Sequence, residues 1–126
     1  MVTCEWMIVC KVVERAQDGE TSLIGVFGRL AADELPAVVS PIVAAFRLRG
    51  EPNEPFEIQI EVMDTDGSPL QGSGVLSHRI PGYGAWDSHV SLAPLTVRSF
   101  GLYKIVVRLN RLAANTMLLQ VEQVVH

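Results

Sequence analysis

The stretch Phe56-Glu57-Ile58-Gln59-Ile60-Glu61-Val62-Met63 decides the fold, because apolar side chains occupy every second position along it. Successive side chains of a β-strand point to opposite sides of the sheet, so the apolar set shares one face. Strict alternation is typical of a strand with one face in the core and the other in water. We therefore expect residues 56–63 to form a half-buried strand whose inward face is Phe56, Ile58, Ile60 and Val62.

Similar short runs recur at even intervals along the rest of the chain, and no long segment has the period of a helix. The expected strands are 4–14, 22–30, 42–49, 56–63, 70–80, 88–97, 101–110 and a last one that carries Met117, Leu119 and Val121. Short strands separated by regularly spaced turns indicate a sandwich or a barrel. We predict an all-β fold, an antiparallel β-sandwich of about eight strands with Greek-key, immunoglobulin-like or jelly-roll-like topology. A single domain is expected to cover residues 1–126.

Two local arrangements follow from this strand assignment. The runs 42–49 and 56–63 are joined by a Pro- and Gly-containing turn, so we expect them to pair as a hairpin that places Arg47 near Glu57. Tyr103 follows a loop at the start of a late strand. This position is typical of the tyrosine corner of Greek-key sandwiches, where the hydroxyl binds the backbone across the connection.

Composition and charge narrow the classes of partner. The 126 residues are 48% hydrophobic with a net charge of −4, and the mean hydropathy is +0.27. So much apolar surface in a small domain favours a subunit contact. The eight arginines and two lysines are scattered, whereas nucleic-acid binding requires a continuous basic stripe. We expect no nucleic-acid partner, and a homo-oligomer or another protein as the partner.

The N-terminal run and the two cysteines indicate a cytoplasmic protein. The sequence MVTCEWMIVCKVVER lacks the basic start of a signal peptide, and no stretch reaches the ~18 apolar residues of a membrane span. Cys4 and Cys10, on one strand, are expected to share a face about 20 Å apart at roughly 3.3 Å per residue, too far to form a disulfide. Free thiols favour a reducing compartment. We expect neither membrane contact nor a cofactor, and the cysteines lack the spacing of a zinc site.

A set of residues spread over nearly the whole chain resembles a known family. The set is Glu5-Trp6, Cys10, Gly19, the run 22–27 with Arg29, Phe46, Gly50, the turn 64–67 and Gly101-Leu102-Tyr103. With these residues the chain resembles a family of short bacterial proteins classed as a domain of unknown function. The resemblance implies an all-β fold and a cytoplasmic bacterial setting. It brings no activity and no catalytic residues.

The most informative candidate site is the loop region 81–89, which presents Tyr83 and Trp86 between glycines beside Asp87 and His89. Aromatic side chains on a sandwich loop can anchor a ligand or partner, because they bring a large contact area at little entropic cost. They can equally fold back and close one end of the core, which the general tendency of aromatics to be buried favours.

Metal and catalytic constellations are weak. Asp64 and Asp66 resemble the start of a calcium loop, but the position of the bidentate glutamate is Val75, so a hairpin turn is the favoured interpretation. Ser77-His78 and Ser88-His89 contain the residue types of a hydrolase. Because neighbours on a strand point to opposite faces, neither pair can readily share a proton. We predict no metal site and no catalytic residue.

Apolar residues on faces expected to point outward suggest an interface. Val43, Ala45, Val106 and Leu118 alternate with charged or polar neighbours, and together on one sheet they would form a contact patch. Three functions are ranked on these grounds. The first is a non-catalytic protein-interaction or self-assembling module. The alternative is binding of a small ligand or carbohydrate through the Tyr83–Trp86 loop, and the least favoured is a hydrolase.

Overall fold

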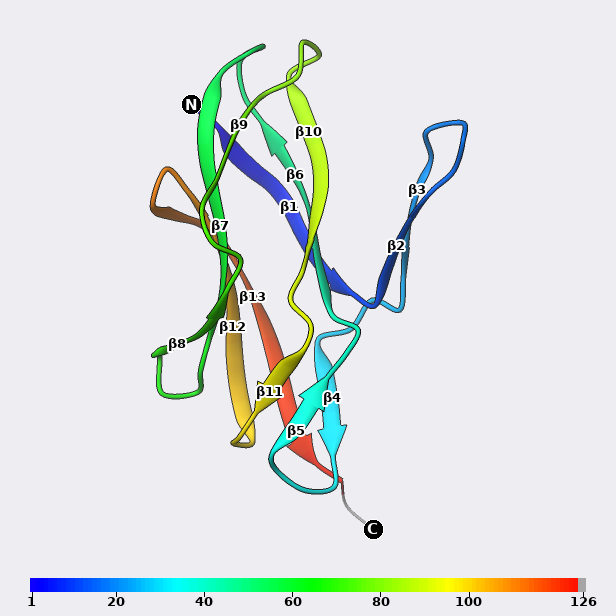
Figure 1. Ribbon diagram of the computed structural model, residues 1–126, viewed down its shortest axis with the longest axis vertical. Helices are drawn as coiled ribbons and strands as arrows, with labels where there is room; N and C mark the ends of the chain where they lie inside the picture. Colours follow the sequence, from blue (N-terminus) through cyan, green and yellow to red (C-terminus); the bar gives the residue numbers. More distant parts are fainter. Residues whose placement is uncertain (125–126) are drawn as a thin grey trace.

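The computed structural model describes residues 1–124, which consist of β-strands and connecting segments (Figure 1). The strands are β1 (Thr3–Cys10), β2 (Val12–Arg15), β3 (Thr21–Ile24), β4 (Arg29–Ala32), β5 (Ala37–Val39), β6 (Val43–Arg49), β7 (Pro55–Met63), β8 (Pro69–Gly72), β9 (Leu76–Arg79), β10 (Ala85–Ser91), β11 (Leu95–Val97), β12 (Gly101–Leu109) and β13 (Leu112–Gln123). No helix occurs in the described part of the chain, so the predicted all-β class is confirmed.

Two principal sheets pack face to face. One has three strands in the order β1-β6-β10, and the other has the order β4-β13-β12-β7-β8, with β9 also paired to β7. Two small sheets, β2-β3 and β5-β11, extend them. The strand pairs are antiparallel except β4 with β13, which is parallel. The antiparallel sandwich expected from the sequence is therefore the observed architecture.

The alternation along β7 defines the core. Phe56, Ile58, Ile60 and Val62 are each exposed by 3% or less, whereas their neighbours on β7 are only half-buried. The inward residues of β12 and β6 pack against them in the same hydrophobic cluster. Burial of each such side chain contributes about 1.5–3 kcal/mol relative to exposure, so this shared dry interior accounts for the sandwich.

More strands form than the sequence indicated. Four of the eight expected runs are each divided in two, and β5 lies between the expected strands 22–30 and 42–49. The breaks fall at Lys11, around Gly25 and Gly28, at Gly72 to Gly74, and next to Pro94. Glycine and proline weaken strand pairing, so these breaks have a local cause in all cases except Lys11.

The expected hairpin between residues 42–49 and 56–63 is wrong. β6 pairs with β1 and β10 in one sheet, whereas β7 pairs with β12, β8 and β9 in the other. The connection 50–54 crosses between the sheets, so the two strands face each other across the core. Arg47 therefore binds Asp87, 2.6 Å between Nε and Oδ1, and Glu57 lies 3.8 Å from Arg111.

The expectation that Cys4 and Cys10 share a face is also wrong. A β-bulge in β1 between Cys4 and Trp6 shifts the register against β6 by one residue. Cys4 is opposite the inward-facing Leu48, and Cys10 is opposite Val43 on the outer side. Both cysteines are free, and burial raises the pKa of both thiols. A bulge reverses the facing of every later side chain, which periodicity alone does not reveal.

The predicted tyrosine corner is confirmed. Tyr103 is fully buried at the start of β12, and its hydroxyl donates a hydrogen bond of 2.7 Å to the carbonyl of Ser99. The same oxygen accepts the backbone N–H of Ser99 at 3.3 Å. The side chain thus ties the segment before β12 to the core.

Replacement of Tyr103 by Phe should lower the free energy of unfolding by about 1–3 kcal/mol, because the carbonyl of Ser99 loses its buried donor. Urea unfolding followed by tryptophan fluorescence measures this loss. Tyr83→Phe is the matched control, since Tyr83 is 77% exposed and should tolerate the change. Equal stability of the Tyr103→Phe variant and the wild type would contradict a structural role of the hydroxyl.

Candidate functional site

A β-hairpin that stands away from both sheets forms one wall of a groove. The hairpin consists of β2 and β3, and we call residues 12–24 the arm; Figure 1 shows it beside the three-stranded sheet. Between the arm and the outer face of that sheet lies a cavity of about 290 Å³, which we call the arm groove. Its lining residues are Trp6, Val13, Arg15, Gly19, Thr21, Leu23, Ala45, Arg47, Asp87, Ser88 and His89. The volume is at the lower end of the range for binding pockets, roughly 300–1,000 Å³.

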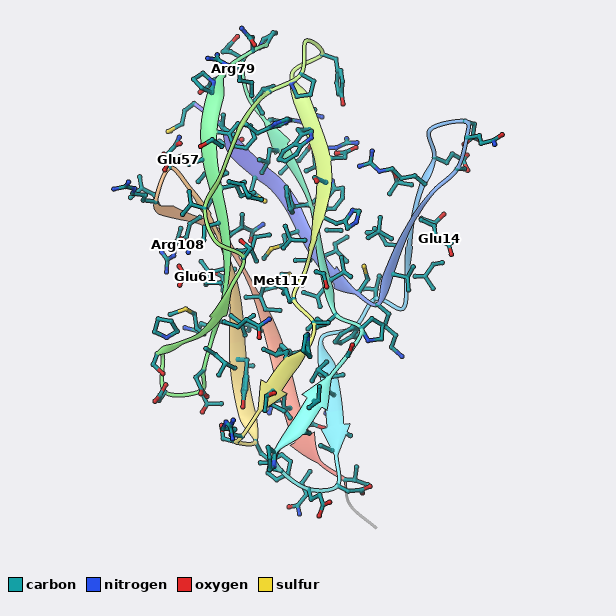
Figure 2. All side chains as sticks on the ribbon, viewed as in Figure 1. Glu14, Glu57, Glu61, Arg79, Arg108 and Met117 are labelled. Carbon is teal, nitrogen blue, oxygen red and sulfur yellow. The ribbon has the colours of Figure 1, made fainter. Side chains whose placement is uncertain are left out.

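Backbone hydrogen bonds at both ends fix the arm. At its base, Lys11 N–H donates to the carbonyl of Ile24 at 3.0 Å, and Phe27 N–H donates to the carbonyl of Val9 at 3.1 Å. At its tip, Ala16 N–H donates to Glu20, and Gly19 adopts a φ of +91°. Glycine takes this left-handed conformation without steric cost, which suits Gly19 to the turn at the tip of the arm. Glu14 lies on the arm, away from the two sheets (Figure 2).

An ion pair forms the floor of the arm groove. Arg47 donates from Nε to Asp87 Oδ1 at 2.6 Å and from Nη2 to Asp87 Oδ2 at 2.8 Å. Paired hydrogen bonds between a guanidinium and a carboxylate are strong and directional. The Arg47 guanidinium holds the pKa of Asp87 below its usual range, and Asp87 raises the pKa of Arg47. The two charges therefore compensate each other on the floor.

The arm contributes a cation of its own. Arg15 donates from Nη2 to the backbone carbonyl of Asp87 at 2.7 Å. None of the ion pairs found in residues 1–124 includes Arg15. The groove is thus lined by the guanidinium of Arg15, whose charge helps to lower the pKa of Asp87 without a direct ion pair, and by the half-buried indole of Trp6.

The two aromatic residues predicted for the 81–89 region lie in different environments. Trp86 is part of β10, and its ring packs against Phe46, Phe56 and His78 with centroid distances of 5.8, 5.6 and 4.4 Å. Tyr83 is 77% exposed. Trp86 therefore closes the end of the core, as the favoured interpretation held, but Tyr83 does not. The two rings do not present one aromatic binding surface.

Asp87 and His89, the other two predicted site residues, are brought together. They are two positions apart on β10 and face the outer side, where both line the arm groove. Ser88 lies opposite the inward-facing Phe46, while His89 lies opposite Ala45. The expectation that Ser88 and His89 point to opposite faces is confirmed.

The four predicted interface residues do not form one patch. Val43 and Ala45 lie on β6 in the three-stranded sheet, whereas Val106 and Leu118 lie on β12 and β13 in the other sheet. Their outer faces point in opposite directions from the core. Ala45 and Val106 are exposed by only 2% and 6%, and Leu118 by 52%. The condition that the four residues share one sheet is therefore not met, because β6 belongs to a different sheet from β12 and β13.

Neighbouring side chains surround Val106 on the outer face of the six-stranded sheet. It lies between Glu61 on β7 and Thr116 on β13 in the strand register. Glu61 accepts a hydrogen bond of 2.7 Å from Arg108, and Figure 2 shows these two residues close together. Long charged side chains cover apolar neighbours with their aliphatic stems.

Asp64 and Asp66 stabilise their own turn. Asp64 Oδ1 accepts the backbone N–H of Thr65 at 2.6 Å, and Asp66 Oδ1 accepts that of Ser68 at 2.9 Å. The hydrogen bonds from Ser68 lower the pKa of Asp66. Residues 64–68 connect β7 to β8, so the hairpin-turn interpretation is confirmed. Within residues 1–124, no three His, Cys, Asp or Glu side chains are grouped as a metal site would require.

Sequence reasoning missed Arg15 and Arg47 as site residues, and it indicated Trp6 only as part of an apolar run that could form a contact patch. The apolar first run gave no sign that Trp6 faces a groove, because the bulge decides its direction. Arg15 is the last residue of β2, and the local pattern around it does not indicate that its side chain reaches β10. The acidic partner of Arg47 was sought on the wrong strand.

The comparisons with known proteins identify a family and similar folds. The model of a "Family of unknown function (DUF6941)" matches residues 5–122. No curated protein matches the chain in sequence. A DNA-bound alkylpurine DNA glycosylase from Pseudomonas fluorescens is similar in structure, with a TM-score of 0.58, 9% identity and 96% of this chain covered. A β-glucosidase from Listeria innocua has a TM-score of 0.56, 10% identity and 100% coverage.

These solved structures are much longer than the chain. It spans 30% of the glycosylase and 16% of the glucosidase. An immunoglobulin-like protein from Pseudomonas aeruginosa is 12% identical with a TM-score of 0.42, and 97% of each chain is covered. At such low identity, the likeness to the two longer enzymes concerns the fold alone. Residues 1–124 include no helix that is long and apolar enough to span a membrane.

The Arg47–Asp87 ion pair should make stability depend on pH. Because the folded-state pKa of Asp87 is depressed, its carboxylate stabilises the fold above the unfolded value of about 3.9. That contribution is lost as the pH falls through the folded-state pKa. The difference in unfolding free energy between wild type and Asp87→Asn should thus shrink as the pH is lowered from 7 to 3.

Urea unfolding at several pH values measures this difference. The same comparison in an Arg47→Gln background is the control, since the charge that depresses the pKa is then missing. A difference between wild type and Asp87→Asn that stays constant down to pH 3 would contradict the coupling.

Proposed function

We propose, for a chain that belongs to the DUF6941 family of unknown function, that it works as a non-catalytic interaction module which holds a segment of a partner protein in the arm groove. One observation carries this proposal. The groove is lined by the indole of Trp6 from the sheet and by the guanidinium of Arg15 from the arm, and Arg15 forms no direct ion pair within residues 1–124. Tryptophan and arginine are the side chains most enriched among residues that dominate binding energy.

The chemistry of the groove indicates what it would hold. Arg47 and Asp87 compensate each other, so the floor offers little net charge. Arg15 then supplies the cation of the wall, while Trp6, Val13 and Leu23 supply apolar surface. A segment with an acidic side chain next to an apolar one is complementary to this arrangement.

The arm is suited to adapt to such a segment. A two-stranded hairpin is marginally stable without further packing. The arm is tied to β10 by the hydrogen bond from Arg15 to the Asp87 carbonyl, and its base is fixed at Lys11 and Phe27. Because the base is fixed, the contact of Arg15 with β10 is the part of the arm that can rearrange around such a segment.

The same geometry favours binding over catalysis. Asp87 and His89 are the groove residues with acid–base chemistry, but the carboxylate of Asp87 is engaged by Arg47, which lowers its pKa. A general base works best with a pKa near the operating pH. The hydroxyl of Ser88 is on the other face of the strand from His89. These features support a site that recognises rather than transforms its ligand.

Selection from a phage-displayed random peptide library on the immobilised protein tests the proposal. Enriched peptides should combine acidic and apolar residues. Fluorescence anisotropy of a labelled selected peptide should show that Trp6→Ala and Arg15→Ala each weaken binding about tenfold, which corresponds to about 1.4 kcal/mol.

Arg111→Ala is the control for Arg15→Ala, because Arg111 is an exposed arginine in the turn between β12 and β13, away from the groove. Circular dichroism checks that each variant folds. Failure to enrich any peptide, or selected peptides that bind the groove variants as tightly as the wild type, would contradict the proposal.

A further inference from the structure

β10 is a sheet edge that no strand pairs with, and the contact described for its backbone is the hydrogen bond from Arg15 of the arm to the Asp87 carbonyl. It forms the outer strand of the three-stranded sheet and pairs with β6 over seven residues in regular register. It contains no proline, lysine or bulge, which are the common devices that prevent edge-to-edge pairing. The opposite edge of the same sheet, β1, is interrupted by its bulge. No strand is hydrogen-bonded to the free edge of β10, although Figure 1 shows the arm on this side of the sheet.

The backbone groups of Asp87 and His89 point toward this open edge. Directly after β10, Leu92 N–H donates to the Ile42 carbonyl at 2.9 Å. Because backbone groups of an antiparallel strand alternate in direction, the N–H and C=O groups of Ser88 and Val90 also point toward β6. The N–H and C=O groups of Asp87, His89 and Ser91 point toward the free edge. The hydrogen bond that Arg15 donates to the Asp87 carbonyl, away from β6, agrees with this assignment.

We propose that a second copy of this chain pairs with β10 antiparallel, about a two-fold axis that passes through Ser88. In this register Asp87 of each copy lies directly opposite His89 of the other, and both residues have outward-facing backbone groups. The imidazole N–H then donates to the carboxylate, twice in one isologous interface. Cross-strand side-chain pairs in which one side chain donates a hydrogen bond and the other accepts it stabilise antiparallel sheets.

Other registers are less complementary. A two-fold axis that passes between two residues would pair unlike positions. It would place a residue whose backbone groups point toward the free edge opposite a residue whose backbone groups already bind β6. An axis through Asp87 opposes two carboxylates, and an axis through His89 opposes two imidazoles. The sequence of β10 thus matches itself best about Ser88, which is why the second copy is the partner inferred here. This inference goes beyond the proposed function, since the new strand extends the sheet and leaves Trp6 in the groove.

Arg15 opposes this pairing in the single copy. Its guanidinium donates a hydrogen bond of 2.7 Å to the Asp87 backbone carbonyl. The backbone N–H of His89 in the second copy would need this same carbonyl as its acceptor. Removal of Arg15 should therefore strengthen self-association, whereas the proposed peptide binding should become weaker. The opposite signs separate a failure of one proposal from a failure of the other.

Sedimentation velocity over a range of protein concentrations measures self-association. We expect a concentration-dependent dimer in the wild type, about tenfold weaker in His89→Glu, which places like charges opposite each other twice. His89→Lys should keep the dimer, and Arg15→Ala should strengthen it severalfold. Gln17→Glu is the control, because it adds the same negative charge at the exposed tip of the arm.

Disulfide trapping tests the register. Residues opposite each other at a non-hydrogen-bonded position lie about 4.5 Å apart between Cα atoms, within disulfide reach. Ser88→Cys should therefore form a covalent dimer on mild oxidation, and Val90→Cys should not, because Val90 would oppose Trp86. The proposal would be overturned if wild type and Arg15→Ala both stay monomeric, or if both cysteine variants are trapped equally. It would also be overturned if His89→Glu leaves the dimer unaffected, or if His89→Lys abolishes it.

Discussion

The structure depends on the contact between the inward faces of two sheets that share one dry interior. β7 contributes every second side chain to this interior, and β6 contributes Ala44, Phe46 and Leu48 from the other side. Neither strand could bury its apolar face alone, because a single sheet leaves one side in water. The core therefore fixes which side chains point outward, and the outward set is what remains available for recognition.

Periodicity carries much of this information, which explains what could be predicted from the sequence. Burial of Phe56, Ile60 and Val62, the turn at Asp64 and the corner at Tyr103 each depend on residues close together in the chain. The two-residue period reports which face of a strand is apolar. It does not report which strand lies beside it, because a neighbour in the sheet and a neighbour across the core impose the same alternation.

The errors about Arg47, Cys10 and Val106 have this common origin. Arg47 was assigned to the wrong partner because β6 and β7 face each other across the core and are not hydrogen bonded. One extra residue in β1 reversed the direction of Cys10 relative to Cys4. Val106 is outward-facing but buried, since neighbouring strands supply charged residues such as Glu61 around it. Long-range pairing and single-residue bulges are the information that local pattern lacks.

The candidate site arises where the chain leaves the sandwich and returns. β1 ends at Cys10, the arm extends from Lys11, and the chain rejoins β1 through the hydrogen bond of Phe27 to Val9. Residues that the core does not need are thereby placed over the outer face of the sheet. One of them, Arg15, reaches the edge strand and occupies a carbonyl that would otherwise be open to another strand. The same side chain therefore forms a wall of the arm groove and occupies an acceptor at the edge of β10, so the proposed recognition in the groove and the proposed pairing at the edge would compete for it.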